Sequence, residues 1–562
     1  MQPRFGGGFM SMYVTLFMCL CCLYGTNLSQ ATPKGKWELL IKDAGVSAMH
    51  MILLPSNKVI IFDRTDFGPS NISLANGACR FDQNELALKK DCWAHSVEYD
   101  IIANKVRPLT LLTDTWCSSG GLNANGDLIQ TGGYNDGSLV VRRFINGCSN
   151  RKAPCDWQEA PNQLAVSRWY ASNQILPDNR FIIVGGRRQF NYEFFPKHGG
   201  LNQPLVHPLD FLAHTSDKVE NNLYPFLHLS TDGNLFIFAN AKSVLLDYHR
   251  NVIVRTYPDM PGGEAHNYPS SGSSVMLPIF ATNDFQFVDV LICGGASPMA
   301  NIQANNDNFI EASRRCGRLR ITEEHPTWIM QTMPMPRVMG DMILLPTSDV
   351  LIINGAQRGS AGWGAARDPA FSPVLYDPYH NHFDVLEASK TARLYHSSAI
   401  LLPSGKVLVA GGNTHINYDF SDPLFPTETS MEAFSPPYLN HSFSCFRPKI
   451  TLLMTGDGSV RYGARFTLQF DVDTFVDSIA LQVNMMSTPF ATHSFSMNQR
   501  MIRLKYSHFK RLSYTKYQLL VEAPPTPIIA PPGYYLLYVV HSTIPSSGSW
   551  IRMHQGVQTP YI

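Results

Sequence analysis

The chain has 562 residues, a formal net charge of +1 and only 16% charged residues. This length accommodates one large β-domain plus a second domain, and the balanced charge argues against binding to nucleic acid or to an anionic membrane surface. The 38 prolines, 40 glycines and 11% aromatic residues are typical of a turn-rich, all-β protein.

Residues 1–31 are predicted to be a signal peptide. Arg4 supplies a positive charge, and the apolar run MYVTLFMCLCCLYG covers residues 12–25. This run is shorter than the ~20 residues that span a bilayer, and no later stretch is apolar enough to do so. A membrane anchor is the alternative. The mature chain is expected to begin near Ala31 or Thr32 and to be secreted.

Cysteine spacing agrees with an oxidising compartment. After removal of the signal peptide, eight cysteines remain, and their close pairs predict the disulfides Cys79–Cys92, Cys148–Cys155 and Cys293–Cys316. Cys117 and Cys445 are then left over; they pair with each other, stay as thiols or serve another purpose. The sequons at Asn71 and Asn440 are predicted N-glycan sites.

One pattern recurs seven times: an apolar run, a turn with Pro or Gly, a second apolar run and a small-residue ending, often Gly-Gly. The spacing is roughly 50–60 residues, as in repeat architectures. The copies are MILLPSNKVIIFD from residue 51, GLNANGDLIQTGG from 121, QILPDNRFIIVGG from 174, LHLSTDGNLFIFAN from 227, VMLPIFATNDFQFVDVLICGG from 275, MILLPTSDVLIINGA from 342 and AILLPSGKVLVAGG from 399.

Each copy is predicted to be a β-hairpin, and a hairpin alone cannot bury its faces. Seven hairpin-containing units indicate a seven-bladed, kelch-like β-propeller over residues 40–430. An irregular β-sandwich is the alternative. After residue 430 the pattern stops, and EAFSPPYLN is interpreted as a linker.

Residues 445–562 are predicted to form a C-terminal, immunoglobulin-like β-sandwich. In FTLQFDV, Phe466, Leu468, Phe470 and Val472 alternate with polar residues, as in a half-buried strand. SIALQV repeats this alternation, and GYYLLYVV is a candidate buried strand.

Four stretches contain side chains that could bind a metal or take part in catalysis. They are TDTWCSSGG with Cys117, SRWYASNQIL with Tyr170, RLYHSSAILL with Tyr395 and His396, and STPFATHSFSMNQR with His493. The first three precede an inner hairpin at equivalent points of the repeat, so they are expected to converge on the propeller axis. Neighbours in a regular strand face opposite ways. Tyr395 and His396 can therefore both face the axis only if the chain is irregular there.

Two imidazoles and two phenols form an N,O donor set that suits Cu(II) better than structural zinc, which prefers Cys and His. The alternative is that these residues are structural: tyrosines buried in the core, histidines whose hydrogen bonds are all made within the protein, and a cysteine that acts as a small apolar side chain. Trp116 and Trp169 flank the site residues, and either is a candidate to pack on Tyr170, although strand alternation favours both pointing away. His266 either lines the substrate pocket or is structural.

The motifs WCSSGG, RWYAS, RLYHSSA and THSFSMNQR resemble, in this order, those of the copper-radical oxidase family, which includes galactose oxidase and glyoxal oxidase. The resemblance covers nearly all of the mature chain and is closest to the plant-type glyoxal oxidases. It implies a seven-bladed propeller whose channel receives a histidine loop from the sandwich. Galactose oxidase has an additional N-terminal carbohydrate-binding domain, for which there is no room before the first repeat.

The resemblance also implies residue roles. One copper ion would be held by Tyr170, Tyr395, His396 and His493, with Tyr395 as axial ligand and general base. Tyr170 would be joined to Cys117 by a thioether bond and would carry a tyrosyl radical. Small aldehydes of the glyoxal or methylglyoxal type would be oxidised to carboxylic acids while O2 is reduced to hydrogen peroxide.

Two alternatives stay open: an oxidase of the same family that acts on primary alcohols or galactose, and a secreted kelch-type binding module without catalysis. The expected partners are a small aldehyde and O2, with no nucleic acid and no membrane. The protein is expected to be an extracellular monomer, in the apoplast or cell wall if it comes from a plant.

Overall fold

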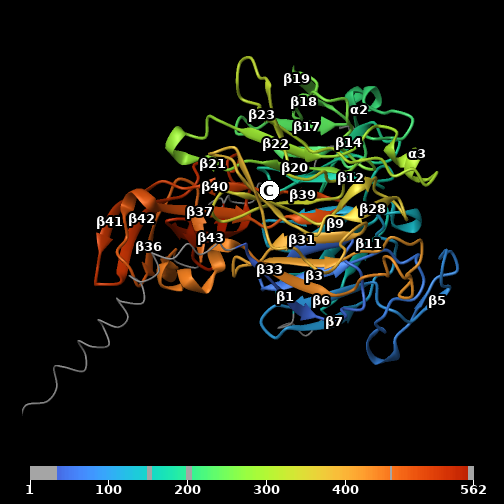
Figure 1. Ribbon diagram of the computed structural model, residues 1–562, viewed down its shortest axis with the longest axis horizontal. Helices are drawn as coiled ribbons and strands as arrows, with labels where there is room; N and C mark the ends of the chain where they lie inside the picture. The colour runs from blue at the N-terminus through green and yellow to red at the C-terminus, as the bar shows by residue number, and fades with distance from the viewer. Residues whose placement is uncertain (1–33, 149–154, 198–204, 456–457, 555–562) are drawn as a thin grey trace, which may run out of the picture.

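The computed structural model describes residues 34–148, 155–197, 205–455 and 458–554, and consists mainly of β-strands. Two parts are distinct in Figure 1: a large group of sheets arranged around a centre, and a smaller orange-to-red part beside it that contains β36, β41 and β42. The all-β prediction is therefore confirmed. The predicted signal peptide lies outside the described residues.

All seven predicted hairpins are present as antiparallel pairs. They are β2 (His50–Leu53) with β3 (Lys58–Phe62), β8 (Ser119–Leu122) with β9 (Leu128–Thr131), β12 (Ala171–Ile175) with β13 (Phe181–Gly185), β16 (Phe226–Leu229) with β17 (Leu235–Ala239), β20 (Gly272–Met276) with β22 (Asp289–Gly294), β25 (Asp341–Leu344) with β26 (Val350–Ile353), and β31 (Ser397–Leu401) with β32 (Val407–Gly411).

Two further strands extend each hairpin outward into a sheet. These are β6 (Ser96–Asp100) and β7 (Lys105–Leu109), β10 (Val141–Phe144) and β11 (Gln158–Ala160), β14 (Asn191–Phe195) and β15 (His207–Pro208), β18 (Lys242–Asp247) and β19 (Val252–Thr256), β23 (Arg315–Arg320) and β24 (Trp328–Thr332), β29 (Val374–Asp377) and β30 (His382–Val385), and β33 (Met431–Ser435) and β1 (Lys36–Ile41).

The last sheet joins both ends of the repeat region, because β1 pairs with β33. This pairing closes the ring; β1 begins before the predicted limit of 40, and β33 lies just after that of 430. It also corrects the linker prediction, since Glu432–Ser435 of EAFSPPYLN belong to β33. Seven sheets of this kind are what a seven-bladed propeller requires; the blade count and the domain limits stay predictions.

A buried arginine ties the start of an inner strand to the glycine bend that ends the next strand. Arg168 Nη1 donates to the carbonyl of Gly185 at 2.6 Å, and Arg393 Nη1 donates to that of Gly411 at 3.0 Å. Gly411 has φ +77°, and a Cβ atom there would lie 2.2 Å from the nitrogen of Ala48. The small-residue ending of the repeat is therefore a steric requirement.

Replacing Arg168 with methionine is expected to destabilise the fold by about 3–5 kcal/mol, because it leaves a buried carboxylate without its charged partner. Arg168 Nε lies 2.8 Å from Glu193 Oε1, and both side chains are fully buried. The thermal unfolding midpoint measures the loss. The double variant Arg168→Met/Glu193→Leu is the control and should recover at least half of it. A single variant within about 1 kcal/mol of wild type would contradict this account.

The C-terminal part contains two facing sheets, and the predicted alternation is confirmed: Phe466, Leu468 and Phe470 are buried while the residues between them are partly exposed. The first sheet contains β34 (Lys449–Met454), β36 (Arg465–Asp471), β42 (Lys516–Glu522) and β41 (Tyr506–Arg511). The second contains β40 (Met501–Arg503), β37 (Leu481–Ser487), β43 (Gly533–His541), β45 (Ser549–His554), β35 (Ser459–Arg461) and β44 (Ile544–Pro545), and the repeat region adds β21 (Ile279–Phe280) to its edge.

One hairpin of the C-terminal part enters the centre of the ring. It is formed by β38 (Phe490–Thr492) and β39 (Phe495–Met497), and β38 pairs with β2. The two strands also contact β8, β12, β16, β20, β25 and β31, so every innermost strand touches the hairpin. Figure 1 shows β39 amid the surrounding sheets.

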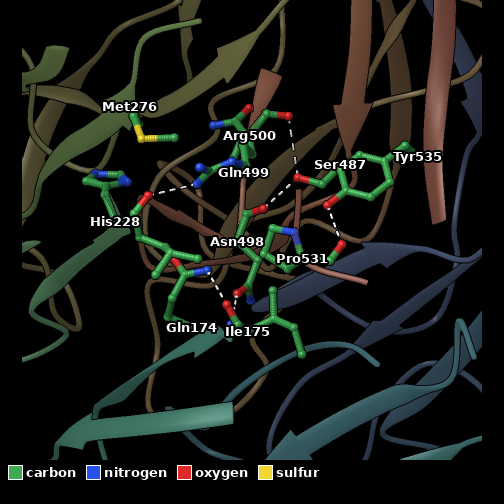
Figure 2. Close-up of a pocket in the computed structure, with 11 residues that line it drawn as sticks. Gln174, Ile175, His228, Met276, Ser487, Asn498, Gln499, Arg500, Pro531 and Tyr535 are labelled. Atoms are coloured by element: carbon green, nitrogen blue, oxygen red, sulfur yellow. Dashed lines mark hydrogen bonds between the residues drawn. The ribbon is translucent and has the colours of Figure 1, made fainter. Parts of the chain in front are cut away.

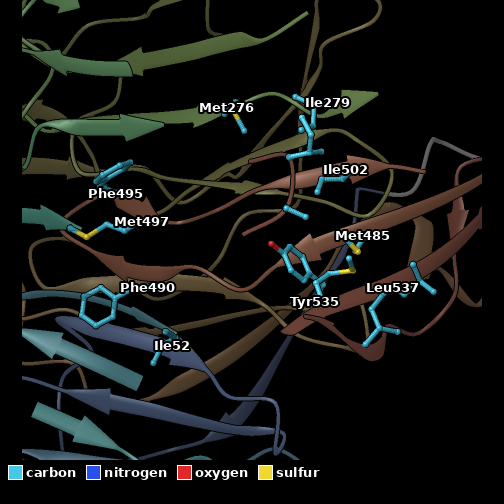
Figure 3. Close-up of a cluster of buried hydrophobic side chains, with 14 of the residues drawn as sticks. Ile52, Met276, Ile279, Met485, Phe490, Phe495, Met497, Ile502, Tyr535 and Leu537 are labelled. Atoms are coloured by element: carbon cyan, nitrogen blue, oxygen red, sulfur yellow. The ribbon is translucent and has the colours of Figure 1, made fainter. Parts of the chain in front are cut away.

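Hydrophobic side chains make this insertion part of one continuous core. Phe490, Phe495 and Met497 of the hairpin belong to the same buried cluster as Met485 and Leu537 of the C-terminal sheet (Figure 3). Each large apolar side chain that is fully buried contributes about 1.5–3 kcal/mol. The hairpin is thus held by packing as well as by its pairing with β2.

The remaining strands and α-helices are small, and several short 3-10 helices accompany them. These strands and α-helices are β4 (Arg80–Phe81) with β5 (Lys90–Asp91), β27 (Ala356–Gly359) with β28 (Ala366–Pro369), α2 (Asp210–His214) and α3 (Ala300–Ala304). Within the described ranges no helix has the length and apolar character to cross a bilayer.

The three predicted disulfides, Cys79–Cys92, Cys148–Cys155 and Cys293–Cys316, are present. Cys117 is fully buried and stays outside them.

Candidate functional site

The predicted site residues of the repeat lie where innermost strands begin, and backbone hydrogen bonds join these starting points. The Tyr170 N–H donates to the carbonyl of Cys117 at 2.9 Å, and the Tyr224 N–H donates to the carbonyl of Tyr170 at 3.0 Å. Residues from separate repeats therefore stand side by side, each just ahead of an innermost strand.

A left-handed backbone residue precedes these strands. The φ angle is +53° at Cys117, +66° at Tyr170 and +60° at His396. Such angles are uncommon for residues other than glycine, and they break the alternation of a strand. Tyr395 and His396 consequently project together, with ring centroids 4.0 Å apart. The irregularity expected from their adjacency is present.

His493 reaches the same place from the C-terminal part. Thr492 pairs with Phe495, so His493 and Ser494 form a two-residue turn, and their φ angles are +43° and +68°. Two positive φ angles define the type I′ turn, whose twist matches that of the flanking strands. The Thr492 hydroxyl lies 2.7 Å from His493 Nδ1 and orients the imidazole.

The other four predicted residues lie around this imidazole. His493 Nε2 lies 3.3 Å from the sulfur of Cys117. The His493 ring centroid lies 5.1 Å from that of His396, 5.6 Å from that of Tyr395 and 6.2 Å from that of Tyr170. Side chains up to 376 positions apart thus share one buried cluster.

His396 has no hydrogen-bond partner at either ring nitrogen, although its side chain is fully buried. Its nearest charged neighbour is Asp63, whose Oδ1 lies 3.6 Å from Nδ1, beyond hydrogen-bonding distance. A buried polar group without a partner is costly and indicates a missing ligand or water. A cavity of about 10 Å³, enough for one water-sized sphere, is lined by Tyr395, His396 and His493 among others.

Burial sets the protonation of the cluster. It lowers the pKa of His396 and of His493 well below the usual value, so both imidazoles are neutral with lone pairs available. It raises the pKa of the Tyr170 and Tyr395 phenols well above theirs. Only a bound cation would hold these phenols as phenolates.

Tyr268 also belongs to the cluster and was missed from the sequence. Tyr170 Oη donates to Tyr268 Oη at 3.1 Å, and Tyr268 Oη lies 2.9 Å from Tyr395 Oη. Its position ahead of the fifth hairpin, two residues after His266, was the available signal. His266 Nδ1 instead lies 2.7 Å from the carbonyl of Gly294.

Aromatic rings cover one side of the cluster. The Trp169 and Tyr170 centroids lie 4.8 Å apart at 39°, so strand alternation wrongly favoured Trp169 pointing away. The left-handed backbone conformation at Tyr170 breaks that alternation. Trp116 packs on Trp169 instead, and the Arg64 guanidinium lies 4.6 Å from the Trp116 ring.

A second cavity, of about 20 Å³, lies nearer the C-terminal part (Figure 2). The Arg500 guanidinium is buried there and donates to the carbonyls of Leu229 and Ile529. Its lining includes His228 and Tyr535 and shares no residue with the five-residue cluster. It therefore belongs to the junction between the two parts of the molecule.

The donors of the cluster fit a copper ion. Two neutral imidazoles and two phenols provide the N and O ligands that Cu(II) accepts, and His396 lacks any other partner. The Cys117 thiol adds a soft sulfur beside them. Among the described residues, the one other group of potential metal ligands, His415, Asp419 and Asp422, is only partly buried.

Comparison with known proteins places these observations in a family. Residues 49–438 match the family model described as "Glyoxal oxidase N-terminus", and residues 447–553 match "Galactose oxidase-like, Early set domain".

Among the curated proteins, the chain is 44% identical over 524 residues to aldehyde oxidase GLOX of Vitis pseudoreticulata, covering 92% of this chain and 97% of that protein. It is also 44% identical over 530 residues to an aldehyde oxidase of Arabidopsis thaliana, covering 92% and 84% respectively. Among the solved structures, a fungal alcohol oxidase of the AA5 family in complex with copper shares the fold, with a TM-score of 0.68 and 18% identity over 92% of this chain and 99% of that one.

Proposed function

This chain belongs to the glyoxal oxidase family, and we propose on that premise that it is a secreted copper-radical oxidase of small aldehydes. The products are the corresponding carboxylic acid and hydrogen peroxide. The observation that carries the proposal is the buried convergence of Tyr170, Tyr395, His396 and His493 beside Cys117, with both nitrogens of His396 unsatisfied. A binding module has no need for such a cluster.

The proposed roles follow from the donor atoms. Tyr170, Tyr395, His396 and His493 hold one copper ion. The sulfur of Cys117 would form a thioether bond with the Tyr170 ring, with loss of one hydrogen from each; O2, the oxidant of the proposed reaction, would accept these two hydrogens. This substituent makes Tyr170 easier to oxidise. The backbone hydrogen bond between residues 117 and 170 supports this pairing.

The reaction removes two electrons and two protons from the hydrated aldehyde. Tyr395, as phenolate, accepts the hydroxyl proton of the substrate. The Tyr170 radical takes the hydrogen atom from the adjacent carbon. Copper, when bound, supplies the acceptor for the second electron and the place where O2 is reduced to hydrogen peroxide. The Trp169 ring, tilted by 39° to the Tyr170 ring, packs against one side of it.

Secretion and glycosylation are part of the proposal. Three disulfides suit an oxidising compartment, and Asn71 and Asn440 are both exposed. The two aldehyde oxidases named above come from plants, and the proposed location is accordingly the apoplast or cell wall. We propose a monomer.

Peptide mapping of the secreted, copper-loaded protein tests the cofactor. We expect the Cys117 and Tyr170 peptides to run as one cross-linked species, two hydrogen atoms lighter than their sum. Reduction should not separate them, because a thioether has no S–S bond. Protein prepared without copper is the control and should yield the two peptides separately. Separate peptides in the copper-loaded protein would contradict the radical mechanism.

Peroxide release on a panel of aldehydes and primary alcohols tests the substrate class. We expect glyoxal-type aldehydes to have a higher kcat/KM than matched alcohols or galactose. A preference for alcohols would instead identify the protein as an oxidase of primary alcohols or galactose. No peroxide from any compound, together with no copper, would favour a binding module.

A further inference from the structure

Tyr268 joins the two phenols that the proposed mechanism uses. Tyr170 donates to its hydroxyl oxygen at 3.1 Å, and the same oxygen lies 2.9 Å from that of Tyr395. These distances are within the range of hydrogen bonds. The three hydroxyls therefore form a chain whose middle member belongs to neither of the motifs that carry Tyr170 and Tyr395.

Packing limits where this hydroxyl can lie. The Tyr268 ring is inclined by only 31° to the Tyr170 ring, with centroids 4.6 Å apart, and it meets the His493 ring edge-on at 5.6 Å. Its backbone forms an isolated bridge with Leu223, ahead of the neighbouring inner strand β16. Both the ring and the backbone of Tyr268 are thus held in place.

The partners of Tyr268 differ from those of a tyrosine that only fills the core. The buried Tyr192, in another sheet, donates its hydroxyl to Asn251 Oδ1 at 3.0 Å. This bond satisfies a buried hydroxyl away from the five-residue cluster. The hydroxyl of Tyr268 is bonded instead to two phenols that exchange a hydrogen atom and a proton with substrate in the proposed mechanism.

We propose that Tyr268 is a positioning residue for the aldehyde oxidation, which holds the Tyr170 and Tyr395 oxygens at their working separation and stabilises the reduced form of Tyr170. The inference rests on the proposed function. In the reaction Tyr170 would be deprotonated, so the Tyr268 hydroxyl, which accepts from Tyr170 here, would donate to its oxygen instead. Such a bond favours the electron-rich phenolate over the neutral radical, so it tunes how strongly Tyr170 oxidises the substrate. It also keeps the Tyr395 oxygen oriented toward the substrate hydroxyl.

Tyr268→Phe tests this directly, because it removes one oxygen atom and keeps the ring. We expect copper content and the Cys117–Tyr170 cross-link at wild-type levels, and a thermal midpoint close to that of the wild type. We expect kcat to fall roughly tenfold to a hundredfold, the factor associated with a hydrogen bond to a charged group, with KM nearly unchanged. The absorption band of the oxidised Tyr170 radical should shift.

Tyr192→Phe is the matched control, a buried tyrosine of another sheet that keeps wild-type kcat and spectrum. Incorporation of 3-fluorotyrosine at position 268 retains the hydroxyl and makes it a stronger donor, so it should restore most of kcat and still move the radical band. Wild-type kcat and an unmoved band in both position-268 variants would overturn the role of Tyr268 alone. A wild-type protein without the cross-link would overturn the proposed function as well.

Discussion

Cys117→Ser is expected to bind copper like the wild type and to lose roughly a thousandfold in kcat, about 4 kcal/mol of transition-state stabilisation. Serine cannot form the thioether, so the Tyr170 phenol becomes harder to oxidise. A one-electron couple changes tenfold per ~59 mV, and a rise of about 180 mV in the potential therefore accounts for the expected loss. The radical absorption and the cross-linked peptide should both be absent.

Two controls separate this chemistry from damage to the fold. Cys117 is fully buried, and a serine hydroxyl there costs about 1–3 kcal/mol of stability if it finds no partner, which the thermal midpoint would report. Cys445→Ser changes the other cysteine outside the three disulfides and should keep wild-type kcat. A Cys117→Ser protein with normal turnover would show that the thioether is not needed.

His493→Ala is expected to weaken copper binding by roughly a hundredfold or more, since loss of even an outer-shell partner typically costs 10–100-fold. His493 is the single candidate ligand supplied by the C-terminal part, and only its hairpin brings it among the inner strands. Metal titration of the copper-free protein, followed spectroscopically, measures the change. The Tyr170 cross-link should form poorly, because its formation requires copper.

The left-handed backbone at His493 calls for a second variant. Alanine at φ +43° adds strain of about 1–2 kcal/mol, whereas asparagine tolerates this region and still lacks the imidazole. His493→Asn should therefore lose copper to the same extent with a smaller loss of stability. His508→Ala, an exposed histidine of β41, serves as the control. Copper affinity at the wild-type level in both His493 variants would refute the proposed ligand.

Local sequence patterns predicted most of the fold. The seven hairpins could be identified because each repeats the same physical requirement: two apolar strands, a tight turn and small residues where Gly411 packs against the backbone of Ala48. The alternation of Phe466, Leu468 and Phe470 predicted a half-buried strand for the same reason. The linker prediction was wrong at Glu432–Ser435 because pairing with β1, almost 400 residues away, cannot be read locally.

The sequence by itself predicted Cys117, Tyr170, Tyr395 and His396 as site residues, since equivalent positions of a repeat are expected to meet at its axis. It could not determine the direction in which their side chains point. That depends on the left-handed backbone at Cys117, Tyr170 and His396, which the surrounding packing imposes on residues that disfavour it.

Only the tertiary structure revealed Tyr268, whose hydroxyl links two phenols from other repeats, and only it showed that His396 has no partner. Hydrogen bonds and their absence depend on atomic distances between segments far apart in the chain. Local sequence patterns do not determine those distances. They are set by the packing of the whole ring around the inserted hairpin.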